Sequence, residues 1–159
     1  MTPCEDNFDQ CPVFGTMSPE ERQHVQQIAE FRFFNKGQTV IRERDAAPQG
    51  LWMLRHGNCH VVRDLSGGAE QQMAMLEPGA IFGEMSFFDP APHSATIRAV
   101  GECELMFLPL VKIETLRMTD LSAAYKLVVN AGQIMASKLR RMDRYTLDLF
   151  PPARTNSGE

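Results

Sequence analysis

The middle of the chain, from about residue 31 to residue 109, consists of short apolar and β-branched runs. Turn-forming sequences such as Lys36-Gly37, Ser66-Gly67-Gly68 and Pro78-Gly79 separate the runs and supply the backbone angles that tight turns require. Short strands divided by such turns are typical of a barrel or roll. We therefore expect a mainly β fold with flanking helices, an eight-stranded, jelly-roll-like β-roll. Its strands are expected at 31–34, 39–42, 50–55, 58–63, 71–76, 80–82, 95–99 and 104–109.

A helix is predicted before the roll. Ser18 can cap free N–H groups, Pro19 suits the first helical position, and Glu21 completes a capping box. The helix is expected to run to about residue 30 and to turn Val25, with Ile28 and Ala29, toward the core.

After Pro109 the sequence is again typical of helix. One long helix is expected at about 121–149, since Gly132 is its sole glycine and proline is absent until Pro151. Apolar positions recur along it at nearly coiled-coil spacing, which predicts a homodimer seam, although the same face would also suit packing on the roll. The seam positions are Val128, Met135, Leu139, Met142, Thr146 and Leu149.

Length and composition fit one domain. The 159 residues are 43% hydrophobic, enough for one core, and we expect an N-terminal segment at 1–13, the domain at 14–149 and a tail at 150–159. The sequence shows neither a long apolar run nor a signal-peptide pattern, so a cytoplasmic protein without membrane contact is expected. A formal charge of -4 argues against direct DNA binding, which needs a basic face.

The four cysteines are expected to be reduced structural thiols. Cys4 and Cys11 fall in the N-terminal segment, while Cys59 and Cys103 fall in predicted strands. No pair has the spacing of a zinc half-site.

The segment 78–99 carries the most chemical information. Gly79 and Gly83 permit close turns, and 83–87 is expected to form one helical turn between strands. Such a turn presents free N–H groups to an anion, and the Glu84 carboxylate near its start can accept hydrogen bonds from sugar hydroxyls. A phosphorylated ribose matches both features.

Phe82-Gly83-Glu84 and the run 92–99 (PHSATIRA) resemble the phosphate-binding cassette of the cyclic-nucleotide-binding domain family, which includes the bacterial catabolite activator protein and the protein kinase A regulatory subunits. The segments 36–41 and 51–57 also resemble early strands of that family, so the similarity covers about 14–149. The resemblance implies a β-roll with a long C-terminal helix that binds cAMP or cGMP, without cofactor, metal or catalysis.

The resemblance also implies roles for single residues. Glu84 would bind the ribose 2′-hydroxyl, and backbone N–H groups of the cassette, with the Ser94 hydroxyl, would surround the cyclic phosphate. The implied ligand-binding residues are Phe82, Gly83, Glu84, Met85, Ser86, His93, Ser94 and Ala95. The candidate base contacts are Met142, Asp143 and Tyr145.

Three positions depart from the family pattern. His93 stands where the family has a phosphate-binding arginine, and a mostly neutral histidine predicts weaker binding. Arg44 stands where a turn glycine is usual, and Met142-Asp143 replaces the hydroxyl pair that contacts the base in the catabolite activator. Arg98 is not expected to substitute for the missing arginine, because its strand parity differs from that of His93.

These observations leave three hypotheses. The first is a stand-alone regulatory sensor that binds a cyclic nucleotide and signals through its C-terminal helix to an effector protein; only nine residues follow Phe150, which is too few for a DNA-binding part. The second is a degenerate fold that acts as a dimerising interaction module without nucleotide. The third is a cupin-like metal enzyme, with ligands among His56, His60, Glu84 and His93.

Overall fold

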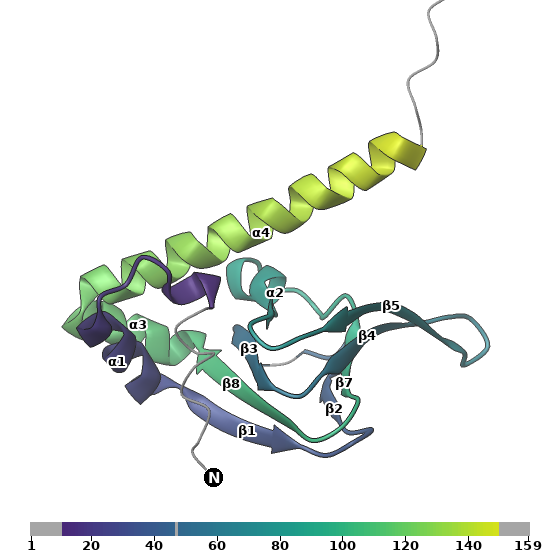
Figure 1. The fold of residues 1–159 in the computed structure, drawn as a ribbon, viewed down its shortest axis with the longest axis horizontal. Coiled ribbons are helices and arrows are strands. Elements are labelled where there is room, and N and C mark those ends of the chain that lie inside the picture. The colour runs from purple at the N-terminus through teal and green to yellow at the C-terminus, as the bar shows by residue number, and fades with distance from the viewer. Residues whose placement is uncertain (1–10, 47, 150–159) are drawn as a thin grey trace, which may run out of the picture.

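The computed structural model describes residues 11–46 and 48–149, and the side chains of this part through residue 144 (Figure 1). Eight strands form two antiparallel four-stranded sheets, and helices gather on one side of them (Figure 1). The strands are β1 (Glu30–Phe34), β2 (Thr39–Ile41), β3 (Gly50–His56), β4 (Cys59–Asp64), β5 (Glu70–Leu76), β6 (Ile81–Phe82), β7 (Thr96–Ala99) and β8 (Cys103–Pro109). The helices are η1 (Pro12–Phe14), α1 (Pro19–Ile28), α2 (Glu84–Phe88), α3 (Leu110–Thr119) and α4 (Leu121–Leu149).

The first sheet has the strand order β1-β8-β3-β6, and the second has the order β2-β7-β4-β5. Both sheets therefore join strands that are distant in sequence, as in a roll. The predicted eight-stranded β-roll is confirmed, and no strand end differs from its predicted position by more than one residue. The strand ends could be predicted because turn-forming residues lie next to them in the sequence.

The central strands β3 and β8 of the first sheet are buried on both faces. In β3, Leu51 and Met53 belong to the core under the helices, whereas Trp52 and Leu54 belong to the core between the sheets. Neighbouring residues of a strand point to opposite faces. Two-sided burial therefore explains why this strand is an unbroken apolar run, as expected of a fully covered sheet. In β8, Met106 and Leu108 face the helices, and Leu105 and Phe107 face the second sheet.

The capping box of α1 is formed as predicted. The Ser18 hydroxyl accepts a hydrogen bond from the Glu21 N–H at 3.2 Å, and the Glu21 carboxylate accepts one from the Ser18 N–H at 2.8 Å. The helix ends at Ile28, two residues before the predicted end, because Glu30 already pairs with Phe107 in the ladder between β1 and β8.

The long C-terminal helix α4 has the predicted limits, but a separate helix, α3, precedes it. Asp120 lies between the two: its N–H donates to the Leu116 carbonyl at the end of α3, and its carboxylate accepts from the Ala123 N–H at 3.0 Å at the start of α4. An aspartate at this position is a common helix-start signal.

Residues just before α1 pack into the core. Cys11 and Val13, which we assigned to a preceding segment, are buried in the core under the helices. Asn130 of α4 holds this stretch, because its side-chain amide donates to the Val13 carbonyl at 2.8 Å and to the Thr16 hydroxyl at 2.9 Å. Residues 1–10 and 150–159 lie outside the described residues, so their assignment as segment and tail stays a prediction.

Three of the four cysteines are described, and all three are buried free thiols. The Cys59 and Cys103 sulfurs lie 3.8 Å apart in the core between the sheets. Burial raises the pKa of Cys59 to about 12. Cys59 is therefore a poor nucleophile, because its reactive thiolate is scarcely populated.

Candidate functional site

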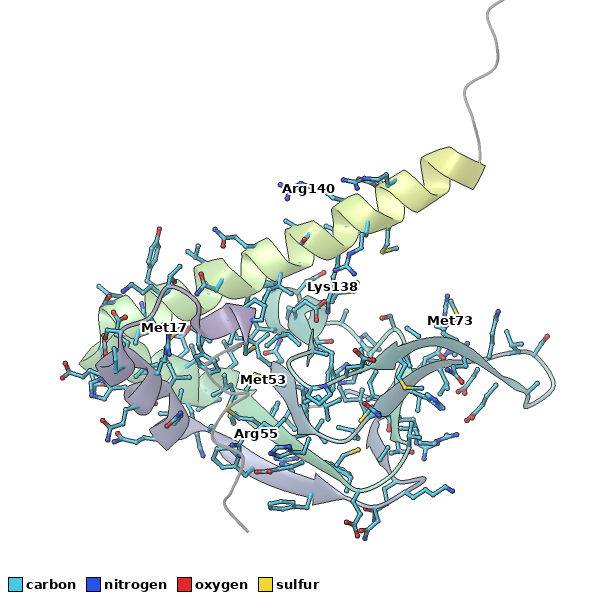
Figure 2. The ribbon with its side chains drawn as sticks, viewed as in Figure 1. Met17, Met53, Arg55, Met73, Lys138 and Arg140 are labelled. Atoms are coloured by element: carbon cyan, nitrogen blue, oxygen red, sulfur yellow. The ribbon has the colours of Figure 1, made fainter. Side chains whose placement is uncertain are left out.

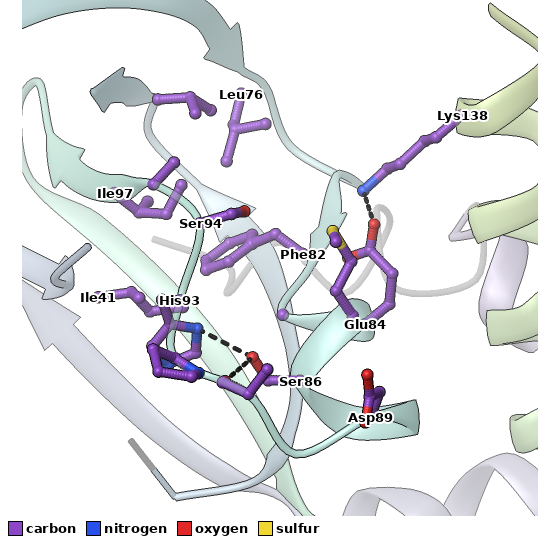
Figure 3. A pocket seen from close by; sticks show the side chains of 16 residues that line it. Ile41, Leu76, Phe82, Glu84, Ser86, Asp89, His93, Ser94, Ile97 and Lys138 are labelled. Atoms are coloured by element: carbon purple, nitrogen blue, oxygen red, sulfur yellow. Dashed lines mark hydrogen bonds and ion pairs between the residues drawn. The ribbon is translucent and has the colours of Figure 1, made fainter. Parts of the chain in front are cut away.

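A cavity of about 280 Å³ opens between α2, the loop that follows it and the second sheet (Figure 3). This volume is close to the lower end of roughly 300–1,000 Å³ that is usual for small-molecule sites. All eight residues predicted to bind the ligand line it. The remaining lining residues are Ile41, Val61, Leu76, Asp89, Ala91, Pro92, Ile97 and Lys138. The structure thus brings the predicted set together, and their binding role stays a prediction.

Gly83 shapes the entrance to α2. Its φ of +79° lies in the left-handed region, and a Cβ there would meet Trp52 Cδ1 at 3.0 Å and the Gly50 carbonyl oxygen at 3.2 Å. Only glycine accepts both constraints without strain. The predicted helical turn is present as α2, and its first N–H groups have no partner within the helix.

Glu84 is the most buried charged group of the cavity lining, with 6% of the residue exposed. Its Oε1 atom accepts a hydrogen bond from the Lys138 ammonium at 2.7 Å, across the gap between α2 and α4 (Figure 3). The same ammonium donates to the Ile81 carbonyl at 2.6 Å. Lys138 was not predicted as a site residue, because a contact across 54 positions has no local sequence pattern.

His93 lies at the other side of the cavity, with 8% of the residue exposed. Its Nδ1 lies 3.3 Å from the Ser86 hydroxyl oxygen, and that hydroxyl donates to the Ala91 carbonyl at 3.2 Å (Figure 3). Since the carbonyl only accepts, the Ser86 proton belongs to that bond, and Nδ1 must donate to Ser86. Nε2 has no partner among the described residues.

The protonation of His93 follows from its surroundings. Burial lowers the pKa of His93 below its ordinary value, and the negative charge of Asp45 opposes this change only in part. A neutral imidazole with its proton on Nδ1 leaves Nε2 as a hydrogen-bond acceptor. At neutral pH His93 therefore supplies no cation at the position of the family arginine, and its Nε2 is itself buried.

The turn containing Arg44 supports the loop that carries His93. Arg44 has a φ of +68°, the left-handed conformation that a glycine would adopt without cost. Its N–H donates to the His93 carbonyl at 2.9 Å, and the His93 N–H donates to the Asp45 carbonyl at 3.4 Å. The backbone conformation expected of the family glycine is therefore kept although the side chain has changed.

Arg98 lies outside the cavity, as its strand parity indicated. It forms a two-pronged ion pair with Glu70 on β5. Met142 and Asp143 are exposed and do not line the cavity, and the side chain of Tyr145 lies outside the described residues. Base contact by these three residues stays a prediction.

The charged residues that line the cavity are Glu84, Asp89 and Lys138, besides the titratable His93. Within the described part of the chain, no three His, Cys, Asp or Glu side chains are grouped so as to hold a metal ion. No described helix is long and apolar enough to span a membrane.

Comparison with known proteins gives the family. The family model for the cyclic nucleotide-binding domain matches residues 31–120, more than half of the 159 residues. The cyclic AMP receptor protein of Thermus thermophilus is 30% identical over 138 residues, which are 87% of this chain and 60% of that protein. A cAMP-dependent protein kinase regulatory subunit of Blastocladiella emersonii is 28% identical over 95 residues, 60% of this chain and 23% of the subunit. The chain thus spans less than two thirds of either relative.

A solved structure is similar to this chain in both fold and sequence. The crystal structure of the Thermus thermophilus catabolite activator protein matches with a TM-score of 0.75 and 30% identity, over 87% of this chain and 62% of that chain. The region that the family model matches contains nearly all of the roll and the cavity-lining segment 82–97. The chain therefore belongs to the cyclic nucleotide-binding domain family, a family of regulatory rather than catalytic domains.

Proposed function

We propose that this chain is a regulatory sensor domain that binds cAMP or cGMP in the cavity between α2 and the second sheet, and that it signals through α4. The observation that carries the proposal is the gathering of all eight cassette residues around one cavity, with Glu84 buried in its lining. The names of the two relatives, a cyclic AMP receptor protein and a cAMP-dependent kinase subunit, favour cAMP as the first ligand to test.

In this proposal the ribose lies against Glu84, whose carboxylate accepts from the 2′-hydroxyl. The cyclic phosphate lies against the first N–H groups of α2, with those of Ser94 and Ala95 and the Ser94 hydroxyl facing it. Phe82 and Ile97 provide apolar surface beside these polar groups. The candidate base contacts Met142, Asp143 and Tyr145 lie on α4, and movement of that helix would be needed to bring them to the base.

The affinity is expected to be lower than in relatives that keep the arginine. A hydrogen bond to a charged group contributes roughly 1.5–3 kcal/mol, so its loss corresponds to about a 10- to 200-fold weaker binding. Neutral His93 does not replace that bond, and the cavity lining carries two carboxylates against one ammonium. Binding therefore depends on backbone N–H groups more than on side-chain charge.

We expect the signal of ligand binding to be transmitted through α4. Leu139 and Met142 are 52% and 65% exposed on the distal part of this helix, which favours a homodimer seam there. An effector protein that recognises the position of α4 would then receive the signal. The proposal places this sensor in the cytoplasm, without direct contact to DNA or membrane.

A second candidate function is a dimerising interaction module that binds no nucleotide. Two observations favour it: Glu84 already has an ion-pair partner, and the His93 position lacks a fixed charge. Calorimetric titration of the purified protein with cAMP, cGMP and cyclic dinucleotides separates the two candidates. Saturable binding of one cyclic mononucleotide supports the sensor, whereas a folded protein that binds none supports the interaction module.

A further inference from the structure

Lys138 marks the point where α4 leaves the rest of the domain. It is the last described side chain of the helix that is not exposed, and residues 139–144 are all exposed. Figure 2 shows Lys138 pointing toward the roll and Arg140 pointing away from it. The contacts of Lys138 are therefore well placed to position the distal helix.

The contacts of Lys138 connect α4 to both sides of Gly83. The ammonium binds the Ile81 carbonyl in β6 and Oε1 of Glu84 at the first position of α2. The ammonium contacts Oε1 of Glu84 and not Oε2. The lysine thus holds one carboxylate oxygen, and in the proposed function the other accepts from the ligand hydroxyl.

We propose that Lys138 is a positioning residue that couples occupation of the cavity to the docking of distal α4. The inference rests on the proposed function and names the contact that would carry its signal. A ligand that needs the Glu84 carboxylate held in this orientation binds the state with Lys138 docked more tightly than the undocked state. By linkage, the ligand then favours docked α4 to the same extent that docked α4 favours the ligand.

A second ion pair on the same helix provides a matched control. Lys126, earlier in α4, binds both Glu21 oxygens, at 2.9 and 2.7 Å. This pair joins α4 to α1 and does not line the cavity. Replacing either lysine removes the cation that pairs with a buried carboxylate. An effect that depends on the cavity should therefore be seen when Lys138 is replaced and not when Lys126 is replaced.

The first arm of the experiment needs no ligand. Hydrogen exchange of the α4 amides is measured in the wild type, Lys138→Met, Lys138→Arg and Lys126→Met. Methionine keeps the stem without the charge, and arginine keeps the charge. We expect exchange at 139–144 to become at least about tenfold faster in Lys138→Met alone, because only that variant loses the contacts of α4 with Ile81 and Glu84.

The second arm measures cAMP and cGMP affinity and repeats the exchange with saturating nucleotide. We expect Lys138→Met to weaken binding by at least about tenfold, Lys138→Arg to stay within about threefold of the wild type, and Lys126→Met to leave affinity unchanged. Nucleotide should slow exchange at 139–144 in the wild type and not in Lys138→Met.

The outcomes are distinct. If Lys138→Met binds nucleotide like the wild type, or nucleotide protects 139–144 equally in both, the coupling proposal is wrong. If the wild type binds neither nucleotide, the proposed function fails and the coupling fails with it. Faster ligand-free exchange in Lys138→Met would then still identify Lys138 as the anchor of distal α4. If Lys138→Met unfolds, Lys138→Gln replaces it as the uncharged variant. Wild-type-like exchange at 139–144 and wild-type-like nucleotide affinity in Lys138→Arg but not in Lys138→Gln would then support the coupling, and equal values in the two variants would contradict it.

Discussion

The Nδ1 atom of His93 lies 3.3 Å from the hydroxyl oxygen of Ser86, and this contact bears on which ring nitrogen of His93 carries the proton. The Ser86 hydroxyl proton is held by the Ala91 carbonyl, so neutral His93 carries its proton on Nδ1. Nε2 gains a proton only when the ring becomes a cation. A cyclic phosphate accepts hydrogen bonds and carries negative charge, so it favours that protonated form.

Cyclic nucleotide binding should therefore strengthen as pH falls. Burial lowers the pKa of His93, so the free protein gains this proton only below the ordinary histidine pKa of about 6.5. The rise in affinity is expected mainly below that value, and the complex should take up a proton on binding. Titrations between pH 5.5 and 8 in buffers of different ionisation enthalpy would measure both. Affinity that is independent of pH would contradict a phosphate contact by His93.

His93→Arg should bind cAMP more tightly than the wild type at neutral pH. Arginine stays charged and can bind phosphate through two N–H groups, so the gain is expected to be about 10- to 200-fold. The variant should also lose the pH dependence of the wild type. His93→Gln is the matched neutral control, and an equal gain in both variants would show that the charge is not the cause.

Glu84→Gln should weaken nucleotide binding by at least about tenfold, because an amide replaces the charged acceptor for the ribose hydroxyl. Glu70→Gln is a suitable control, since Glu70 pairs with Arg98 outside the cavity. Thermal unfolding of both variants should confirm that they remain folded. Retained affinity in Glu84→Gln would exclude the ribose contact.

Charged substitutions in the proposed dimer seam should yield a folded monomer. Leu139→Asp and Met142→Asp each place a carboxylate on the exposed distal part of α4, where burial against a second copy would then be costly. Val111→Asp, on the exposed side of α3, is the control outside the seam. Sedimentation at several concentrations gives the oligomeric state, and a wild type that stays monomeric at high concentration would contradict the homodimer.

Arg44→Gly should raise stability, although glycine usually lowers it. A non-glycine residue in the left-handed region costs roughly 1–2 kcal/mol, while the greater freedom of glycine in the unfolded chain costs about 0.5–1 kcal/mol. The expected net gain in the free energy of unfolding is about 0.5–1 kcal/mol. Arg42→Gly, at an exposed position with negative φ, should instead destabilise the protein. Urea unfolding of both variants tests this opposite sign.

The strands and the start of α1 could be predicted because their signals are local. Glycine, proline and the Ser18 capping box act within a few residues of the backbone that they shape, so their pattern is readable along the chain. The positive φ at Arg44 is consistent with the glycine that the family usually has at this position, because glycine adopts positive φ readily. The division of the C-terminal helices at Asp120 also had a local signal, which a search for acidic helix caps would find.

Two features of the site could not be predicted, since they depend on contacts between distant segments. The Lys138 partner of Glu84 comes from a helix whose path over α2 is fixed only by the packed core. The neutral state of His93 depends on its burial and on Ser86, which the fold brings beside it. A sequence pattern indicates which groups are present but not how far each is removed from water.

The two-sided burial of β3 and β8 has a consequence for how the protein unfolds. Removing the helices would expose Leu51, Met53, Met106 and Leu108 to water, while the opposite faces of the same strands hold the interior of the roll. Because β3 and β8 belong to both cores, neither layer retains its packing when the other is lost. The helical layer and the roll should therefore melt in one calorimetric transition, and a fragment that ends at Pro109 would be an aggregation-prone sheet rather than an independent β domain.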